Sequence, residues 1–398
     1  MNPIEKTTQF VFQTYLRRGK AFVRGEGATL IDEEGKAYTD FLAGIAVCNL
    51  GHCHPEITRA IERQARTLVH VSNLFYTAPQ ADLAAALVEK SFADRVFFSN
   101  SGAEANEAAI KLARRYFQSK GNKSRYKIIT MEQSFHGRTM ATLSATGQDK
   151  IKEGFYPLLE GFIHVPFNDI DALKAQLDDT VAAVMLEPIQ GEGGVIPADP
   201  DYLAQVRALC DETGTLLIFD EIQTGMGRCG TLFAHELYKT PPDIMTLAKA
   251  LANGIPIGAM LATQDAAKGF DLGSHGSTFG GTPLATAAAL EVVNIISDKA
   301  FLAGVNEKGA YFCEKLLELK EKHSRIIDVR GKGLLIGMEI DLDSEGDKDK
   351  DAGFFVANCF EKGFIINGIQ DKILRFAPPL IIGKTEIDRL VAVLDSLF

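Results

Sequence analysis

Hydrophobic and polar residues follow two different patterns along the chain. Between residues 21 and 43 they alternate around two turn-forming segments, which predicts a small antiparallel meander. From about residue 55, short apolar runs alternate with longer helical patterns, which predicts an α/β fold with a doubly wound, mainly parallel sheet and helices on both faces. The predicted strands are 95–99, 127–130, 181–187, 216–220, 243–247 and 257–262, and the predicted helices are 56–70, 79–90, 103–118, 201–213 and 282–296.

The end of the chain has a mixed pattern that indicates an α+β domain. Its helical stretches are 299–321, 352–361 and 384–397, and its strand-like stretch is 326–341. We expect the N-terminal and C-terminal segments to form one small domain beside a larger one. The expected division is a small-domain segment at 1–50, a large cofactor-binding domain at 51–290 and the rest of the small domain at 291–398.

Composition narrows the class of partner. The chain of 398 residues carries 42 Lys and Arg against 52 Asp and Glu, a net charge of −10, which argues against nucleic acid or an anionic membrane. The six cysteines are scattered and include no CxxC pair, so we expect neither disulfides nor a zinc site, and we expect a reducing cytoplasm. No apolar run reaches membrane-spanning length, and the N-terminus lacks the pattern of a signal peptide.

A candidate phosphate site follows the predicted strand 95–99. The segment from Ser99 to Asn106 opens a helix, where backbone N–H groups and the helix dipole favour an anion. The alternative, that Ser99 or Ser101 only caps the helix, remains open. Thr278, in a flexible polar loop, is a second candidate phosphate donor.

Two strand ends carry the most specific chemistry. Asp220 is the last residue of the strand 216–220, where an open α/β sheet places ligand-binding side chains, and Lys249 follows the strand 243–247. A buried carboxylate needs a cationic partner, and a pyridinium nitrogen is one such partner. A lysine that forms a Schiff base with an aldehyde would complete a pyridoxal phosphate site.

Two other motifs suggest different ligands. Gly225 to Gly230 fits GxGxxG, but these glycines neither end the strand directly nor open a long helix, as a nicotinamide-dinucleotide site requires. His52, Cys53 and His54 resemble a metal cluster. No further ligand lies at a suitable spacing, so we interpret them as turn residues and expect no metal.

Several motifs in one order resemble those of the class III pyridoxal phosphate aminotransferases of fold type I. The resemblance runs from about residue 21 to the C-terminus and rests on SNSGAEANEAAIKLAR, SFHGRT, LEPIQGEGG, FDEIQTGMGR, LAKALANG, GSTFGG and ILRFAPPL. Within this class, GIAVCNLGHCHP, SNLFY and SFHGRTMATLSATGQ are most similar to the acetylornithine aminotransferases of arginine biosynthesis.

The resemblance implies how pyridoxal phosphate is held. Lys249 would form the Schiff base, and Asp220 would keep the pyridine nitrogen protonated. Gly102 and Ala103 would bind the phosphate. Ala103 replaces a threonine that is frequent in the family, so only its backbone amide carries over. Thr278 would reach the phosphate of the neighbouring subunit, which implies a homodimer with shared sites.

Four further residues would contact the cofactor. By resemblance, Phe135 would stack on the ring and Ile222 would pack on its other face. Gln223 would hydrogen-bond the ring hydroxyl, and Glu221 is also expected in the cofactor site. For Phe135 the alternative role of a core aromatic remains open.

The resemblance also implies how substrate carboxylates are bound. The planar fork of arginine suits carboxylates, and Arg138 and Arg375 match the family's carboxylate-binding arginines. Glu187 is expected to neutralise Arg375 when an ω-amine substrate is bound. Ser277 is expected to add a contact across the dimer, and Tyr15 is a further candidate. For Arg375, a structural salt bridge between domains is the alternative.

The implied reaction transfers the δ-amino group of N2-acetylornithine to 2-oxoglutarate. Ornithine, succinylornithine and 4-aminobutyrate transaminases are similar in the same motifs, so these amine donors remain alternatives. A racemase or decarboxylase on the same scaffold, a nicotinamide-dependent oxidoreductase that uses the 225–230 glycines, and a non-catalytic scaffold are further alternatives. Retention of Lys249 and Asp220 together argues against the scaffold.

Overall fold

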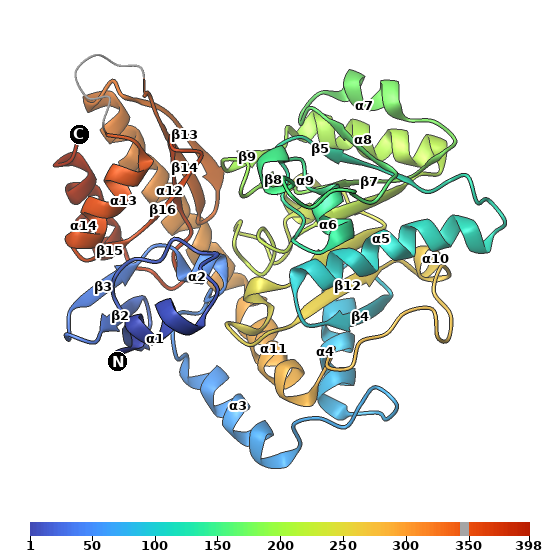
Figure 1. Ribbon diagram of the computed structural model, residues 1–398, viewed down its shortest axis with the longest axis horizontal. Helices are drawn as coiled ribbons and strands as arrows, with labels where there is room; N and C mark the ends of the chain where they lie inside the picture. Colours follow the sequence, from blue (N-terminus) through green and yellow to red (C-terminus); the bar gives the residue numbers. More distant parts are fainter. Residues whose placement is uncertain (343–349) are drawn as a thin grey trace.

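A seven-stranded sheet forms the centre of the computed structural model, which describes residues 1–342 and 350–398 (Figure 1). Its strand order is β4-β12-β11-β10-β7-β5-β6. β12 pairs antiparallel with both β4 and β11, and the other pairings are parallel. The α/β fold with a mainly parallel sheet is therefore confirmed. The strand bounds are β4 Arg95–Ser99, β5 Lys127–Met131, β6 Phe162–Val165, β7 Val181–Leu186, β10 Leu216–Asp220, β11 Ile244–Leu247 and β12 Gly258–Ala262.

Helices cover both faces of this sheet because its central strands are apolar on both sides. All side chains of β10 are buried. Leu216 and Ile218 pack in the same cluster as apolar residues of α5 (Gly102–Ser119), whereas Leu217 and Phe219 pack with residues of α8 (Pro200–Thr213). Consecutive residues of a strand point to opposite faces, so α5 and α8 lie on opposite sides of the sheet. We call this sheet with its helices the large unit. It also includes α3 (Pro55–Thr67), α4 (Ala78–Glu89) and α11 (Pro283–Ile296).

The two ends of the chain form a second, small unit, on the left of Figure 1. The predicted meander is present as β1 (Phe22–Glu26), β2 (Thr29–Asp32) and β3 (Ala37–Asp40), and β3 pairs with β15 (Phe364–Ile365). A second sheet has the order β13-β14-β17-β16. Its strands are β13 Ile326–Lys332, β14 Leu335–Ile340, β16 Asn367–Ile369 and β17 Ile373–Phe376, and the helices beside it are α12 Lys299–Lys322, α13 Ala352–Glu361 and α14 Lys384–Asp395.

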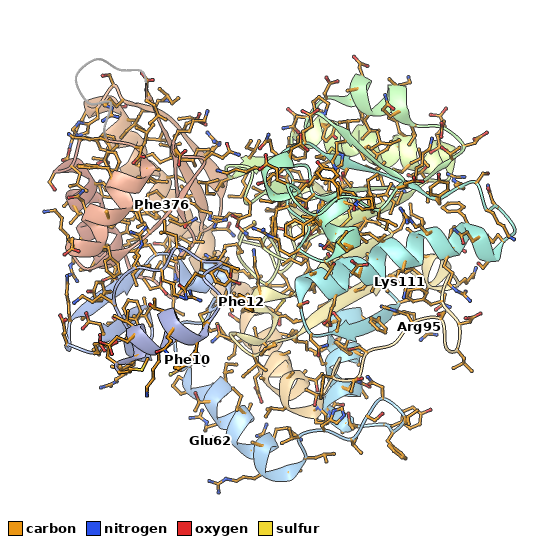
Figure 2. The ribbon with its side chains drawn as sticks, viewed as in Figure 1. Phe10, Phe12, Glu62, Arg95, Lys111 and Phe376 are labelled. Carbon is orange, nitrogen blue, oxygen red and sulfur yellow. The ribbon has the colours of Figure 1, made fainter. Side chains whose placement is uncertain are left out.

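Residues from both ends of the chain share one apolar core in the small unit. Phe41 packs there with Phe312 and Phe376, and all three side chains are fully buried (Figure 2). The pairing of β3 with β15 joins the same segments through backbone hydrogen bonds. The N-terminal meander therefore depends on the C-terminal segment for its packing.

Short elements are where the sequence patterns failed. The helices and strands that were not predicted are α1 Pro3–Phe10, α2 Ala43–Ala46, α6 Met140–Ala145, the 3-10 helices Asp149–Ile151 and Lys249–Ala252, β6, α7 Ile170–Gln176, β8 Ile189–Gln190, β9 Ile196–Pro197, α9 His235–Tyr238, α10 Gln264–Ala267, β15, β16 and β17. All of them span two to eight residues, which is too short for a clear hydrophobic period. The stretch 326–341 is a hairpin of β13 and β14.

The segment that fits GxGxxG has a structural role. It forms consecutive turns after β10 and does not open a long helix, since α9 has only four residues. Arg228, fully buried within it, donates through Nη1 to the carbonyl oxygens of Leu334 (3.0 Å) and Pro378 (2.6 Å) and through Nη2 to Asn49 Oδ1. This guanidinium therefore ties the large unit to two segments of the small unit.

We predict that Arg228→Ala lowers the free energy of unfolding by about 2–4 kcal/mol, because it leaves buried carbonyl groups without donors. Urea denaturation followed by circular dichroism measures this loss. Arg24→Ala is the control, because Arg24 is 66% exposed and its ion pair is with the exposed Glu26, so we expect a change below about 0.5 kcal/mol. Equal effects of the two substitutions would contradict this role of Arg228.

Candidate active site

One cavity of about 380 Å³ lies at the carboxyl ends of the parallel strands and contains both Asp220 and Lys249. Asp220 is the last residue of β10, and Lys249 begins a 3-10 turn (Lys249–Ala252) just after β11. The pairing of β10 with β11 places the two strand ends side by side. The structure thus brings together the two residues that the sequence placed at strand ends.

The Asp220 carboxylate is buried among hydrogen-bond donors. Its Oδ2 accepts from Asn106 Nδ2 (2.7 Å) and lies 2.8 Å from His136 Nδ1, and its Oδ1 accepts from the backbone N–H of Ile222 (3.1 Å). Among the described residues, His136 Nε2 has no partner, which favours the neutral tautomer that donates from Nδ1 to Asp220. Asn106 is itself fixed, because its Oδ1 accepts from Thr246 Oγ1 (2.7 Å). These donors hold the Asp220 carboxyl group in one orientation at the end of β10.

Lys249 combines a strained backbone with a perturbed amine. Its φ of +37° lies in the left-handed region, which is unusual for a residue with a side chain. Burial lowers the pKa of its amine, and the positive charge of Arg375 acts in the same direction, whereas Glu192 and Asp220 oppose this shift. A lysine with a lowered pKa is a better nucleophile and base near neutral pH.

The turn between β4 and α5 offers an anion site at a helix N-terminus. Ser101 caps α5, since its Oγ accepts from the N–H of Glu104 (3.2 Å), and Gly102 and Ala103 follow at the cavity wall. A Cβ on Gly102 would lie 2.7 Å from Ile222 Cδ1, so a larger residue here would displace the Ile222 side chain. The capping role and the anion site are therefore compatible.

Two apolar side chains and one cation complete the near wall of the cavity. Phe135 and Ile222 line it, and the Arg138 guanidinium lies 5.6 Å from the centre of the Phe135 ring. In the part of the chain that the structure describes, no carboxylate pairs with Arg138. Its fork is thus available to an anion that enters the cavity.

In this structure Arg375 is paired with Glu192, whereas Glu187, the partner expected from the sequence when an ω-amine substrate is bound, makes other contacts. Arg375 Nη1 lies 2.5 Å from Glu192 Oε1 and donates to Gln223 Oε1 (3.2 Å), while Gln223 Nε2 is 3.4 Å from Glu192 Oε1. Burial disfavours a charged Glu192, but Arg375 and Lys249 outweigh it and hold its pKa below the ordinary value. Both Nε and Nη2 of Arg375 are buried and have no partner among the described residues, so they can bind a carboxylate.

Glu187 instead holds two backbone segments of the cavity wall. Its Oε2 accepts from the N–H of Phe135 and its Oε1 from the N–H of Gly191, both at 3.1 Å. Burial raises the pKa of Glu187 to about 7, and the charge of Asp220 adds to this shift. The carboxyl group thus joins the SFHGR segment to the loop that carries Glu192.

Four predicted residues lie outside this cavity lining. Glu221 is buried and accepts from the N–H groups of Ala234 and His235 at the start of α9, so its side chain is turned away. Ser277 contacts the cavity residue Asn100 without lining the cavity itself. Thr278 lines a separate, smaller pocket, and Tyr15 is 73% exposed in the N-terminal segment. The sequence had not singled out Asn106, His136 and Glu192, although all three lie inside the quoted motifs.

The residues present fit pyridoxal phosphate. Asp220 offers an anion for a protonated ring nitrogen, and Phe135 and Ile222 offer apolar contacts for a flat ring. The start of α5 offers N–H groups for a phosphate. Lys249 supplies the amine, and the cavity exceeds the lower limit of small-molecule pockets.

We predict that Glu221→Gln removes a loss of stability that the wild type shows as pH rises. Burial raises the pKa of Glu221 from 4.5 to about 8. Between these values the folded protein holds a proton that the unfolded chain has lost, so the wild type loses stability as pH rises through this window. The variant cannot ionise, but its side chain has a single oxygen and can accept from only one of the two N–H groups. It should therefore be less stable than the wild type at pH 5 and should lose less stability than the wild type between pH 5 and pH 9, as measured by urea denaturation. The same difference at both pH values would contradict the buried, shifted carboxyl.

Comparisons with known proteins agree with this geometry. The family described as aminotransferase class-III matches residues 16–398. The acetylornithine aminotransferase of Caldanaerobacter subterraneus is 52% identical over 98% of this chain and 97% of its own length, and that of Methanocaldococcus jannaschii is 50% identical over 100% and 98%.

Solved structures show the same similarity. The N-acetylornithine aminotransferase of Stenotrophomonas maltophilia has a TM-score of 0.85 and 39% identity, covering 99% of this chain and 97% of that one. The ornithine aminotransferase of Toxoplasma gondii has a TM-score of 0.93 and 34% identity, covering 98% and 93%. The chain belongs to the class-III aminotransferase family.

Proposed function

We propose that this chain is an acetylornithine aminotransferase of arginine biosynthesis, which transfers the δ-amino group of N2-acetylornithine to 2-oxoglutarate with pyridoxal phosphate as cofactor. The observation that carries the proposal is the single cavity that joins Asp220 and Lys249 to Arg138 and to the Arg375–Glu192 pair. The relatives at 50% and 52% identity, which are acetylornithine aminotransferases, support this choice of donor.

The cofactor would be held by residues that line the cavity. Gly102 and Ala103 would bind the phosphate, Phe135 and Ile222 would enclose the ring, and Asp220 would bind the ring nitrogen. When bound, the cofactor supplies an aldehyde that accepts amines and a ring that withdraws electrons from the substrate. The donors from Asn106 and His136 hold the Asp220 carboxyl group in place, so it could serve as the partner of the ring nitrogen.

Lys249 is the proposed proton carrier. Lys249 lines the cavity, and its lowered pKa increases the fraction of free amine that can take a proton from the substrate carbon. The surrounding strand ends and the strained turn fix its backbone, which limits where the amine can reach. The negative charges of Glu192 and Asp220 stabilise the protonated form of this amine.

Substrate choice would depend on whether Arg375 is neutralised. Acetylornithine presents its distal amine and one carboxylate, which Arg138 can bind while Glu192 keeps Arg375 paired. Glutamate and 2-oxoglutarate carry two carboxylates, so the second must displace Glu192 to reach Arg375. Gln223 can hold Glu192 after this displacement, because it already contacts both partners.

The proposal includes a homodimer with shared sites. Thr278 is exposed and does not line the cavity of its own chain, which is compatible with a contact to a second subunit. Several large apolar side chains are exposed, among them Leu74, Tyr76 and Leu272, and Phe10 and Phe12, which are labelled in Figure 2. Exposed apolar surface of this kind is typical of an interface.

We predict that the purified protein with bound cofactor shows a visible absorbance that N2-acetylornithine bleaches and 2-oxoglutarate restores. Ornithine, succinylornithine and 4-aminobutyrate are compared as donors in the same stopped-flow assay. Lys249→Ala should abolish turnover, a loss of more than about 1,000-fold, because it removes both the amine and the proton carrier. Lack of bleaching by any ω-amino acid would refute the aminotransferase activity.

We predict that Glu192→Gln and Arg375→Ala shift the balance of the two half-reactions in opposite directions. Arg375→Ala should slow the 2-oxoglutarate half-reaction about tenfold or more relative to the acetylornithine half-reaction, because it removes a charged contact to a carboxylate. Glu192→Gln should lower the KM for 2-oxoglutarate, because Arg375 is no longer neutralised.

Glu187→Gln is the matched control for this comparison. It removes a buried carboxylate of the same cavity but leaves Arg375 paired, so it should affect both half-reactions alike. If Glu187→Gln changes their ratio and Glu192→Gln does not, Glu187 is the gate and the proposed role of Glu192 is wrong.

A further inference from the structure

Asn100 links two loops that have separate tasks in the proposed function. It lies between β4 and α5 in the phosphate turn (residues 100–104) and lines the cavity. Its Nδ2 donates to Glu104 Oε2 (2.8 Å) and to Ser277 Oγ (3.1 Å), and its backbone N–H donates to the same Glu104 oxygen (2.7 Å). A side-chain amide has two N–H hydrogens, so both contacts can be made at once.

Ser277 belongs to the Thr278 loop (residues 276–281). Its Oγ also accepts from the N–H of Gly280 (3.0 Å), which closes the loop around Thr278. Gly280 packs against β4 so closely that a Cβ there would lie 2.2 Å from the carbonyl oxygen of Phe98. The loop is therefore held by the strand that leads into the phosphate turn, and Asn100 is its direct contact with that turn.

We propose that Asn100 is a positioning residue that couples the phosphate site of one subunit to that of the other. The inference rests on the proposed function, in which Thr278 serves the phosphate of the partner subunit. A phosphate bound at Gly102 and Ala103 fixes the phosphate turn and, through Asn100 and Ser277, the Thr278 loop of the same chain. That loop then presents Thr278 to the partner's site, so cofactor bound in one subunit strengthens binding in the other.

The coupling has a defined size and direction. Because binding free energies are reciprocal, each subunit must favour the other by the same factor. One neutral hydrogen bond carries the link between the two loops, which limits the factor to about two- to tenfold. In this proposal Ser277 acts on the cofactor site without touching the cofactor.

The test is an equilibrium titration of the full-length dimer, depleted of cofactor, with pyridoxal phosphate, followed by the fluorescence of the bound cofactor. The wild type should give an isotherm steeper than that of independent sites. Ser277→Ala removes the link and leaves the contact of Asn100 with Glu104, so its isotherm should become that of independent sites. Because Ser277→Ala also removes contacts that exist without cofactor, the thermal unfolding midpoint of the depleted protein should fall slightly, by about as much as in Asn73→Ala, which loses two hydrogen bonds to the same loop.

Asn73→Ala is the matched control. Asn73 Nδ2 donates to the carbonyl oxygens of Ser277 (3.0 Å) and Gly280 (2.9 Å), so its loss loosens the same loop without touching the phosphate turn. It should weaken binding and keep the steep isotherm. A wild-type isotherm of independent sites, or a steep one for Ser277→Ala, would overturn the coupling.

Failure of the proposed function gives a different result. If the full-length protein does not bind pyridoxal phosphate, the cofactor assignment fails and the coupling fails with it. If it binds the cofactor but Thr278→Ala leaves the affinity unchanged, the contact between subunits is absent, which overturns the coupling while the aminotransferase activity stands.

Discussion

A buried carboxylate at the end of β10 determines how the centre of this molecule is built. Asp220 is 3% exposed, and an anion in such a place requires donors and a nearby positive charge. Asn106 supplies a donor from α5, and His136 supplies another from the loop after β5. These contacts fix where a helix, a loop and a strand meet, so the geometry that holds the anion also shapes the cavity.

Two glutamates of the same motif show how surroundings, and not residue type, assign a role. Glu187 and Glu192 both line the cavity, but their pKa values are shifted in opposite directions, upward for Glu187 and downward for Glu192. Glu187 meets backbone N–H groups and lies near Asp220, so burial raises its pKa to about 7. Glu192 meets the Arg375 guanidinium, whose charge outweighs burial. Only the second can serve as a counter-ion that a substrate carboxylate displaces.

The sequence was sufficient for the long elements and for residues at strand ends. β4 and β10 have the predicted bounds, and α13 matches its prediction at 352–361, because buried strands and capped helices have clear patterns. Asp220 and Lys249 were expected at the same edge of the sheet because each follows or ends a strand, and the carboxyl ends of parallel strands lie at one edge. These predictions need only the order of the helices and strands and the spacing of their hydrophobic residues.

The sequence could not identify contacts that depend on loop conformation. Glu192 follows Gly191 in a loop in which Gly194 (φ +117°) and Val195 (φ +54°) both adopt left-handed conformations. No periodic pattern determines which glutamate such a loop turns toward β17. The contact of Ser277 with Asn100 joins positions 177 residues apart for the same reason. The side chain of Glu221 points away from the cavity because it accepts hydrogen bonds from the backbone at the start of α9.

The two arginines proposed to bind carboxylates lie on different units. Arg138 belongs to the SFHGR segment of the large unit, whereas Arg375 lies on β17 of the small unit. The separation between them, which a substrate with two carboxylates must match, is therefore set by the seam between the units. Arg228 crosses that seam with hydrogen bonds to Asn49, Leu334 and Pro378. If the two arginines bind carboxylates as proposed, Arg228 would help to set the distance between them without contacting the substrate.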